Sequence, residues 1–119
     1  MTKRRFLRGR LGESVAVSYL ENQQFQILER NYYTKHGEID VIAMDPRLLL
    51  LIFVEVKSYQ LDGDIHPLEV MTSRKQRHLV KTAECYIVRT QSVDIQCRFD
   101  LIIVDQDKVL DHIEDIIQV

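Results

Sequence analysis

The chain has 119 residues, of which 45% are hydrophobic and 29% charged, and its formal net charge is −2. This length suits a single domain, 1–119, that buries one core without disulfide or metal staples, and the charge excludes a uniformly basic nucleic-acid-binding protein. The longest apolar run, Leu48–Val54, is too short to span a bilayer, so we expect no membrane partner.

Cysteine usage and the N-terminal residues favour a cytoplasmic protein. Cys85 and Cys97 show no metal-ligand spacing, so we interpret them as reduced thiols. The basic N-terminal residues are not followed by an apolar segment, and no secretory signal is recognised.

Positive charge gathers in two segments. One is the stretch 1–10, which ends at Arg10 and could form a mobile basic arm, and the other is the stretch 74–81. A protein polarised in this way can hold nucleic acid on one face. Two solvated faces without a partner would give the same pattern.

The hydrophobic pattern predicts an α/β fold with the element order α-β-β-β-α-β(-β). Helical spacing marks residues 11–22, and a cap at Thr72 or Ser73 begins a second helix that runs to about Arg89. Strands are expected at 26–33, 38–44, 48–57, 99–104 and 108–113, with a loop at 58–67. The first three strands imply an antiparallel meander, and the strand-helix-strand passage that follows allows a parallel neighbour. We therefore expect a mixed central sheet with helices packed on it.

Charged residues interrupt the apolar strands at 38–44 and 48–57. Side chains alternate along a strand, so Glu55 and Lys57 share one face. A hairpin with a four-residue turn, Asp45–Leu48, would bring Asp40 beside Glu55 on one side of the sheet. A simpler interpretation is a strand-end ion pair of Glu55 with Lys57, with Asp40 merely solvated.

Two adjacent carboxylates suggest a metal site. They repel each other unless a cation neutralises them, and hard divalent ions such as Mg²⁺ or Mn²⁺ prefer oxygen ligands. Asp40 and Glu55 would hold the ion, and the backbone carbonyl of Val56 could supply a further ligand. The ammonium of Lys57 would orient the attacking water and stabilise charge that builds on a phosphate.

Glu13 lies within the apolar stripe of the first predicted helix, in line with Ala16, Val17 and Leu20. A carboxylate in that position needs a partner, which a metal or Lys57 would provide. The helix macrodipole, which favours acidic residues near the N-terminus, explains the residue equally well.

The motifs Gly37-Glu38-Ile39-Asp40-Val41-Ile42-Ala43 and Phe53-Val54-Glu55-Val56-Lys57 resemble the YraN family of predicted endonucleases, within the PD-(D/E)xK superfamily. Gly12-Glu13, Lys75-Gln76 and Arg98-Phe99-Asp100 extend the similarity over nearly the whole chain. The arrangement is also similar to archaeal Holliday-junction resolvases. One departure follows the lysine, where Ser58-Tyr59 stand in place of the Thr-Arg of many relatives.

The resemblance implies a restriction-endonuclease-like fold and a metal-dependent DNA endonuclease. Glu13, Asp40, Glu55 and Lys57 would be the catalytic residues. By analogy to junction resolvases, the substrate could be branched or recombination-intermediate DNA. Those enzymes act as dimers, so the analogy also suggests a homodimer.

Other polar and aromatic residues are less specific. Arg74, Lys75 and Gln76 open the second helix and, with Arg10, are candidates for nucleic-acid binding, although a solvated helix turn is the alternative. Asp100 is expected to pair with a basic neighbour. The four histidines lack zinc spacing and are interpreted as surface or loop residues. Tyr32, Tyr33 and Phe53 could stack on bases, but core packing is the simpler assignment.

Two other classes of function compete with the endonuclease. The first is a catalytically idle nucleic-acid-binding or accessory protein that keeps the fold, which the absence of net positive charge favours. The second is a protein-interaction domain, in which the basic segments have no nucleic-acid role.

Overall fold

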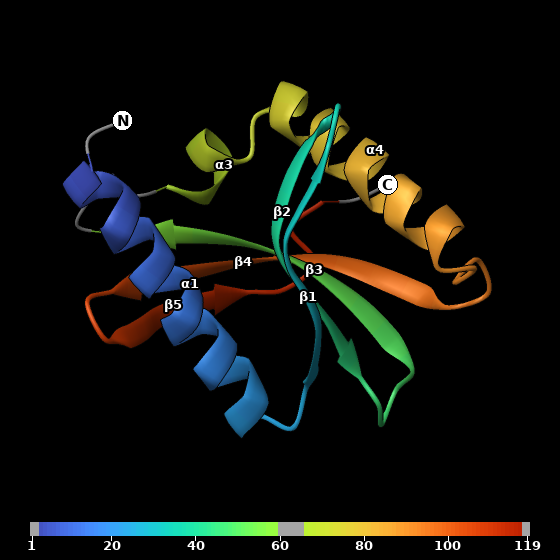
Figure 1. The fold of residues 1–119 in the computed structure, drawn as a ribbon, viewed down its shortest axis with the longest axis horizontal. Helices are drawn as coiled ribbons and strands as arrows, with labels where there is room; N and C mark the ends of the chain where they lie inside the picture. The colour runs from blue at the N-terminus through green and yellow to red at the C-terminus, as the bar shows by residue number, and fades with distance from the viewer. Residues whose placement is uncertain (1–2, 60–65, 118–119) are drawn as a thin grey trace.

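The computed structural model describes residues 3–59 and 66–117, with side chains from residue 11 onward except those of 67 and 68. The elements in chain order are α1 (Lys3–Asn22), β1 (Gln26–Thr34), β2 (Gly37–Asp45), β3 (Leu50–Ser58), α3 (Pro67–Val70), α4 (Ser73–Arg89), β4 (Gln96–Asp105) and β5 (Lys108–Ile113). Figure 1 shows their arrangement.

The strands of this part of the chain form one five-stranded sheet in the order β1-β2-β3-β4-β5. β1, β2 and β3 are an antiparallel meander, β3 and β4 are parallel, and β4 and β5 are antiparallel. The predicted mixed sheet is therefore confirmed. The α/β fold class also matches the prediction, with the element order of the restriction-endonuclease-like type.

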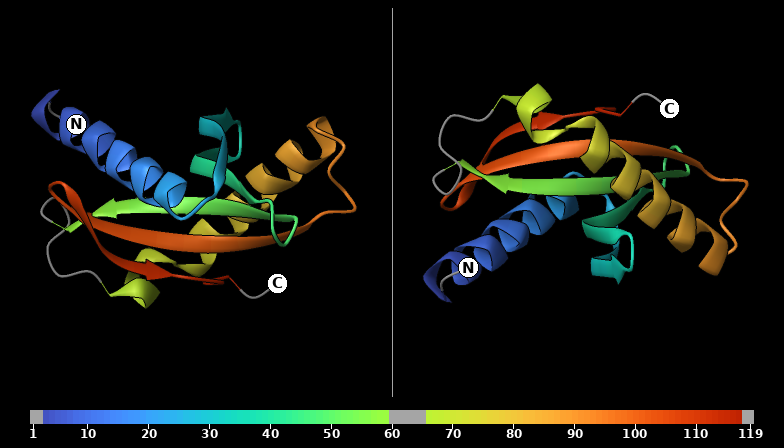
Figure 2. Two further views of the ribbon diagram at one scale, coloured as in Figure 1. Left: turned by 90° about the horizontal axis from the view of Figure 1, so that it is seen from below. Right: turned by 90° about the horizontal axis from the view of Figure 1, so that it is seen from above.

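Two hydrophobic clusters cover the two faces of the sheet, and α1 and α4 lie on opposite sides of it (Figure 2). Ala16 and Leu20 of α1 pack against the face that carries Ile52 and Ile102. The other cluster joins residues of α4 and the strands, among them Ile42, Leu51, Phe53, Leu79, Ala83, Tyr86, Phe99 and Leu101. Apolar residues on both faces of β3 explain its unbroken hydrophobic run. Among the described residues, every helix is too short or too polar to span a bilayer.

Several predicted boundaries shift. α1 begins at Lys3 rather than at residue 11, so residues 3–10, treated above as an arm, form the start of this helix. The predicted loop 58–67 ends in the short helix α3, and its residues 60–65 lie outside the described part of the chain.

The turn between β2 and β3 keeps the predicted parity. The N–H of Leu48 donates to the carbonyl of Asp45 at 3.3 Å, and the N–H of Arg47 donates to the Asp45 carboxylate at 3.0 Å. The strands end at Asp45 and begin at Leu50, which leaves four residues between them. An even loop places directly opposed side chains on the same face.

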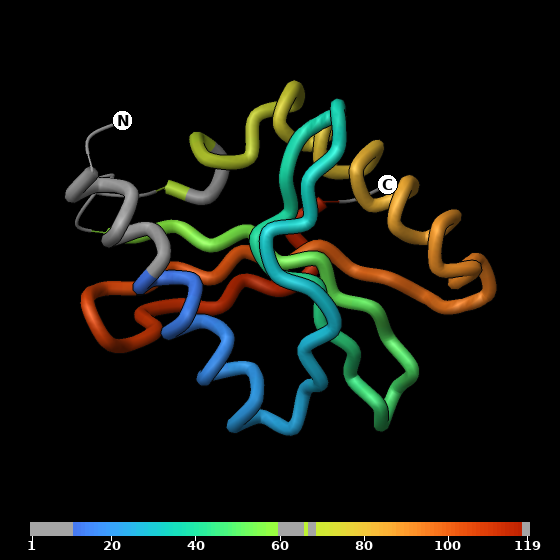
Figure 3. Tube along the Cα trace, viewed as in Figure 1, coloured from blue at the N-terminus to red at the C-terminus, as the bar shows by residue number. Residues whose placement is uncertain are grey.

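The β1–β2 hairpin turns away from the rest of the sheet, and its tip lies next to α4 (Figure 3). The Oγ1 of Thr34 donates to the Oγ1 of Thr82 on α4 at 3.4 Å. Gly37, which follows the turn, has φ +145°, a conformation that glycine adopts without strain. A Cβ at this glycine would lie 3.7 Å from the Cβ of His78, so the hairpin tip lies directly against the helix.

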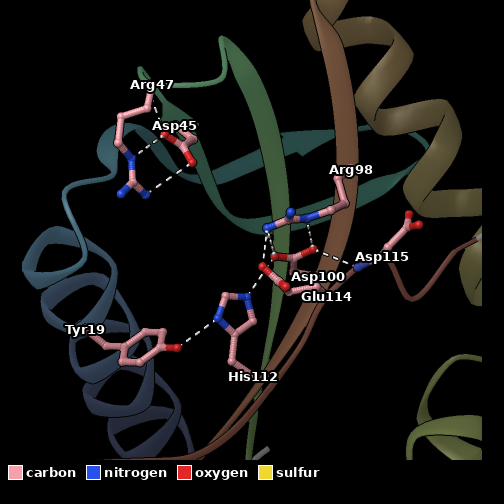
Figure 4. A network of polar contacts seen from close by, with 8 residues as sticks. All are labelled: Tyr19, Asp45, Arg47, Arg98, Asp100, His112, Glu114 and Asp115. Carbon is pink, nitrogen blue, oxygen red and sulfur yellow. Dashed lines mark hydrogen bonds and ion pairs between the residues drawn. The ribbon is translucent and has the colours of Figure 1, made fainter.

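A polar network fastens α1 to the far edge of the sheet (Figure 4). The fully buried Asp100 carboxylate accepts from Arg98 at 2.8 and 3.0 Å and from the backbone N–H of Asp115 at 3.0 Å. The Nε2 of His112 lies 2.8 Å from the same carboxylate, and its Nδ1 lies 2.9 Å from the Tyr19 hydroxyl. Asp100 thus pairs with a basic neighbour as predicted. His112 is not a surface residue, because its side chain is only 11% exposed.

Burial raises the pKa of Asp100, but the hydrogen bonds from His112, Arg98 and the Asp115 N–H outweigh that effect and leave the pKa below the ordinary 3.8. The carboxylate is therefore stabilised in its ionised form inside the protein. This network holds α1, and with it Glu13, in a fixed position relative to the sheet.

Candidate metal centre

Asp40 lies where the β2–β3 hairpin opens. The ladder between these strands ends at the pair of Val41 and Val54, and Asp40 is the next residue of β2. Its Oδ2 accepts a 2.8 Å hydrogen bond from the backbone N–H of Val56 and so replaces the missing strand partner. The N–H and C=O of one strand residue point to the same edge, so the Val56 carbonyl lies on the edge of β3 that faces Asp40.

Glu55 is buried and is held by two lysines. Its Oε1 accepts from the Nζ of Lys75 at 2.8 Å and lies 3.9 Å from the Nζ of Lys57. Lys75 is positioned by the start of α4, where the side chain of the N-cap Thr72 accepts from the Lys75 backbone N–H. The predicted ion pair of Glu55 with Lys57 is therefore longer than the ion pair of Glu55 with Lys75. Lys75, which was also predicted as a nucleic-acid-binding residue, makes the shorter of these two ion pairs.

Three carboxylates meet beside this pair. One oxygen each of Glu13, Glu38 and Asp40 lies within 4.8 Å of the others. Glu13 reaches the group from α1, as the resemblance implied, whereas Glu38 was not predicted as a site residue. Its position on the strand face of Asp40 was the only signal in the sequence.

The electrostatics of Asp40 reflect this crowding. Burial is the largest cause that raises its pKa well above 3.8, and the charge of Glu55 is the second. The hydrogen bond from Val56 opposes them, while Glu13 and Glu38 add to the rise. Ionised Asp40 is therefore unfavourable in this position unless a further cation approaches it.

A cavity of about 250 Å³ opens next to these groups. Its lining consists of Gly37, Glu38, Asp40, Glu55, Lys75, His78 and Leu79. His78 is exposed, as expected of a surface residue, and it also borders this cavity. The position of His78 at the cavity could not be predicted, because the hairpin tip and α4 meet only in the folded chain.

The other predicted binding residues are Gln76, Arg74 and Arg10. The Nε2 of Gln76 donates to the carbonyl of Met71 at 2.8 Å, so this side chain stabilises the start of α4. Arg74 is exposed in the first turn of the same helix. Arg10 belongs to α1, and its side chain lies outside the described residues.

The donor set fits a hard divalent cation. The ligand atoms that the described residues bring together here are the carboxylate oxygens of Glu13, Glu38 and Asp40, and a cation would relieve the repulsion on Asp40. Asp100, His112 and Glu114 form a second group with suitable spacing in the described part of the chain. The hydrogen bonds of Asp100 and the 2.9 Å ion pair of Glu114 with Arg98 already occupy those oxygens. That group is therefore structural.

The fold and this centre define a class of α/β domain with a mixed sheet. In this class, carboxylates from α1 and from β2 converge where the β2–β3 hairpin opens. The profile of the uncharacterised protein family UPF0102 matches residues 12–104. The chain belongs to this family, which is the YraN family that the motifs indicated.

Relatives of similar length support the assignment. A UPF0102 protein of Chlorobium chlorochromatii is 44% identical over 94 residues, which cover 79% of this chain and 70% of the relative. A UPF0102 protein of Persephonella marina is 36% identical over 110 residues, or 92% of each chain. A third, from Coxiella burnetii, is 36% identical over 108 residues, which cover 90% of this chain and 88% of the relative.

Proposed function

We propose that this protein is a Mg²⁺- or Mn²⁺-dependent endonuclease that hydrolyses phosphodiester bonds in DNA. The observation that carries the proposal is the burial of Asp40 among Glu13, Glu38 and Glu55. A protein that only needed a stable core would gain nothing from like charges held together, because their repulsion opposes folding. Such groups cluster where a site is arranged for chemistry.

Each residue has a distinct role in this proposal. Asp40, Glu55 and the Val56 carbonyl would hold the cation, which would lower the pKa of a bound water and neutralise charge on the phosphate. Lys57 stabilises the extra negative charge as the water oxygen bonds to phosphorus and the ester P–O bond breaks. Glu13 orients the water or accepts its proton.

Lys75 fixes the orientation of Glu55 and offsets its negative charge through the 2.8 Å ion pair. Arg74, Gln76 and Arg10 remain candidates for contacts to the DNA backbone. Branched DNA as substrate, and the homodimer that would place two sites on it, are the finer form of the proposal and rest on the analogy to junction resolvases. A cytoplasmic location fits the free thiols of Cys85 and Cys97.

One observation favours a second candidate, a nucleic-acid-binding accessory protein without catalysis. Lys75 already neutralises Glu55 at 2.8 Å, and an internal lysine can take the place of a metal in balancing a buried carboxylate. In that case the acidic centre would be a structural remnant, and the raised pKa of Asp40 would favour its protonated form.

Cleavage assays separate the two candidates. Single-stranded, duplex and four-way-junction DNA are incubated with Mn²⁺ and wild-type protein, Asp40→Asn, or Glu29→Gln as a control on a distant carboxylate. The amide still accepts the Val56 N–H, so Asp40→Asn tests chemistry rather than folding. We expect cutting by wild type and by the control variant, and none by Asp40→Asn. Binding without cutting on every substrate would favour the accessory protein.

A further inference from the structure

Tyr33 is the most exposed of the large hydrophobic residues in the described part of the chain, with 77% of its surface accessible. It is the second-to-last residue of β1 and lies directly opposite Glu38 of β2. Opposed residues of an antiparallel pair lie on the same face with their Cβ atoms close together. The ring is therefore next to the carboxylate that joins Asp40 and Glu13 in the metal centre.

Core packing explains the neighbouring tyrosine but not this one. Tyr32 is half-buried, and its ring makes an edge contact with Tyr86 of α4 at a centroid distance of 5.3 Å. Successive side chains of a strand point to opposite faces, so Tyr33 points away from that contact. A large aromatic ring in water is available to bind a flat apolar surface.

Cationic and histidine residues lie at the tip of the hairpin and on the helix beside it. Lys35 and His36 form the tip of the hairpin, between Thr34 and Gly37. α4 presents the exposed side chains of Arg74, Arg77, His78 and Lys81, which share one helical face at spacings of three, four and seven. The Thr34–Thr82 hydrogen bond joins the hairpin to this helix. A nucleic-acid strand whose phosphates follow these basic side chains would thus pass the carboxylates around Asp40 and place one of its bases near Tyr33.

We propose that Tyr33 is a stacking platform for an unpaired base, and that the substrate is therefore a single-stranded or locally unpaired nucleic acid. This inference rests on the proposed function and names its substrate class. Inside a continuous duplex, away from its two ends, both faces of each base are already stacked, so only a base outside the helix can place a face on an external ring. Stacking is tolerant of sequence because every base has a π-face.

The chain offers a direct reporter of this contact because it contains no tryptophan. Tyr33→Trp introduces a single indole, and Leu48→Trp is the matched control at the exposed β2–β3 turn, where Leu48 is 68% accessible. Each full-length variant is titrated with a single-stranded oligonucleotide and with a blunt duplex of equal length. Ca²⁺ replaces Mn²⁺ to limit cutting. We expect the indole emission of Tyr33→Trp to be quenched by the single strand and not by the duplex, with no change for Leu48→Trp.

Binding measured by fluorescence anisotropy gives the second readout. Tyr33→Ala should weaken single-strand binding by roughly 5- to 150-fold, the range expected for one stacked base, whereas Tyr33→Phe should bind like wild type. Equal affinity of wild type and Tyr33→Ala, an equal loss on duplex, or no single-strand binding by wild type would overturn the proposal. So would a Tyr33→Ala effect confined to the oligomeric state, which would make the ring a protein contact.

The outcomes also separate this proposal from the endonuclease. Selective single-strand binding through Tyr33, without cutting under Mn²⁺, would leave the platform in place and remove the enzyme. Mn²⁺-dependent cutting that is equally efficient in Tyr33→Ala would leave the enzyme and remove the platform.

Discussion

Replacement of Asp100 by alanine should destabilise the fold far more than the loss of an exposed carboxylate. The side chain is fully buried and accepts from Arg98, His112 and the Asp115 N–H. Removal of one partner of a buried ion pair costs about 3–5 kcal/mol. We expect about 3 kcal/mol, the lower end, because Arg98 keeps its 2.9 Å contact with Glu114. With roughly 0.25 kcal/mol/K of unfolding entropy for a chain of this length, Tm should fall by about 12 °C.

The matched comparison is Glu29→Ala. Its ion pair with Arg89 is longer, at 3.6 Å, and the two side chains are 39% and 55% exposed, so its loss should cost less than about 1 kcal/mol. Urea unfolding followed by circular dichroism measures both variants. Equal losses for Asp100→Ala and Glu29→Ala would refute the argument that the Asp100 network fixes α1 on the sheet.

Three further predictions follow from the same contacts. Asp40→Asn should raise the urea midpoint of the metal-free protein at pH 7. The reason is the raised pKa of Asp40, which means that the wild-type protein loses stability as pH rises from 3.8 through the folded-state value. The stability gained by the variant should vanish near pH 3. The pKa of Asp100 is lowered, so its effect on stability is the opposite: wild-type stability should fall as pH drops from 3.8 through the folded-state value. In Asp100→Asn, urea unfolding should show a smaller loss of stability over this acid range. Gly12→Ala should lower the free energy of unfolding in urea by about 1 kcal/mol, although alanine favours helices. The reason is that the new Cβ would lie 3.0 Å from Val104 in a packed core. A gain in stability would show that α1 can move away from β4.

The β2–β3 hairpin could be predicted because it depends on residues that are close together in the sequence. Alternation along two neighbouring strands and an even turn were enough to place Asp40 and Glu55 together, and a shift of the strand ends by one or two residues left that parity intact. Thr72 as the cap of α4 follows from the same kind of short-range signal.

The remaining contacts depend on segments that are far apart in the sequence. Tyr19 and His112 are separated by 93 positions, and their hydrogen bond exists only because β5 closes the sheet beneath α1. The reach of Lys75 to Glu55 depends on where α4 starts relative to β3. Tyr33 was expected to pack in the core, but its neighbour Tyr32 is the residue that packs against α4.

The central claim is that the carboxylates around Asp40 bind a divalent cation, and thermal unfolding with increasing Mn²⁺ tests it most directly. At a hundred times the dissociation constant, binding to the folded state alone adds ~2.7 kcal/mol, which corresponds to a rise in Tm of about 11 °C at this chain length. We expect this rise in wild type and in Glu29→Gln, and its loss in Asp40→Asn and Glu55→Gln. A Tm that does not respond to Mn²⁺, or one that rises equally in all four proteins, would contradict the claim.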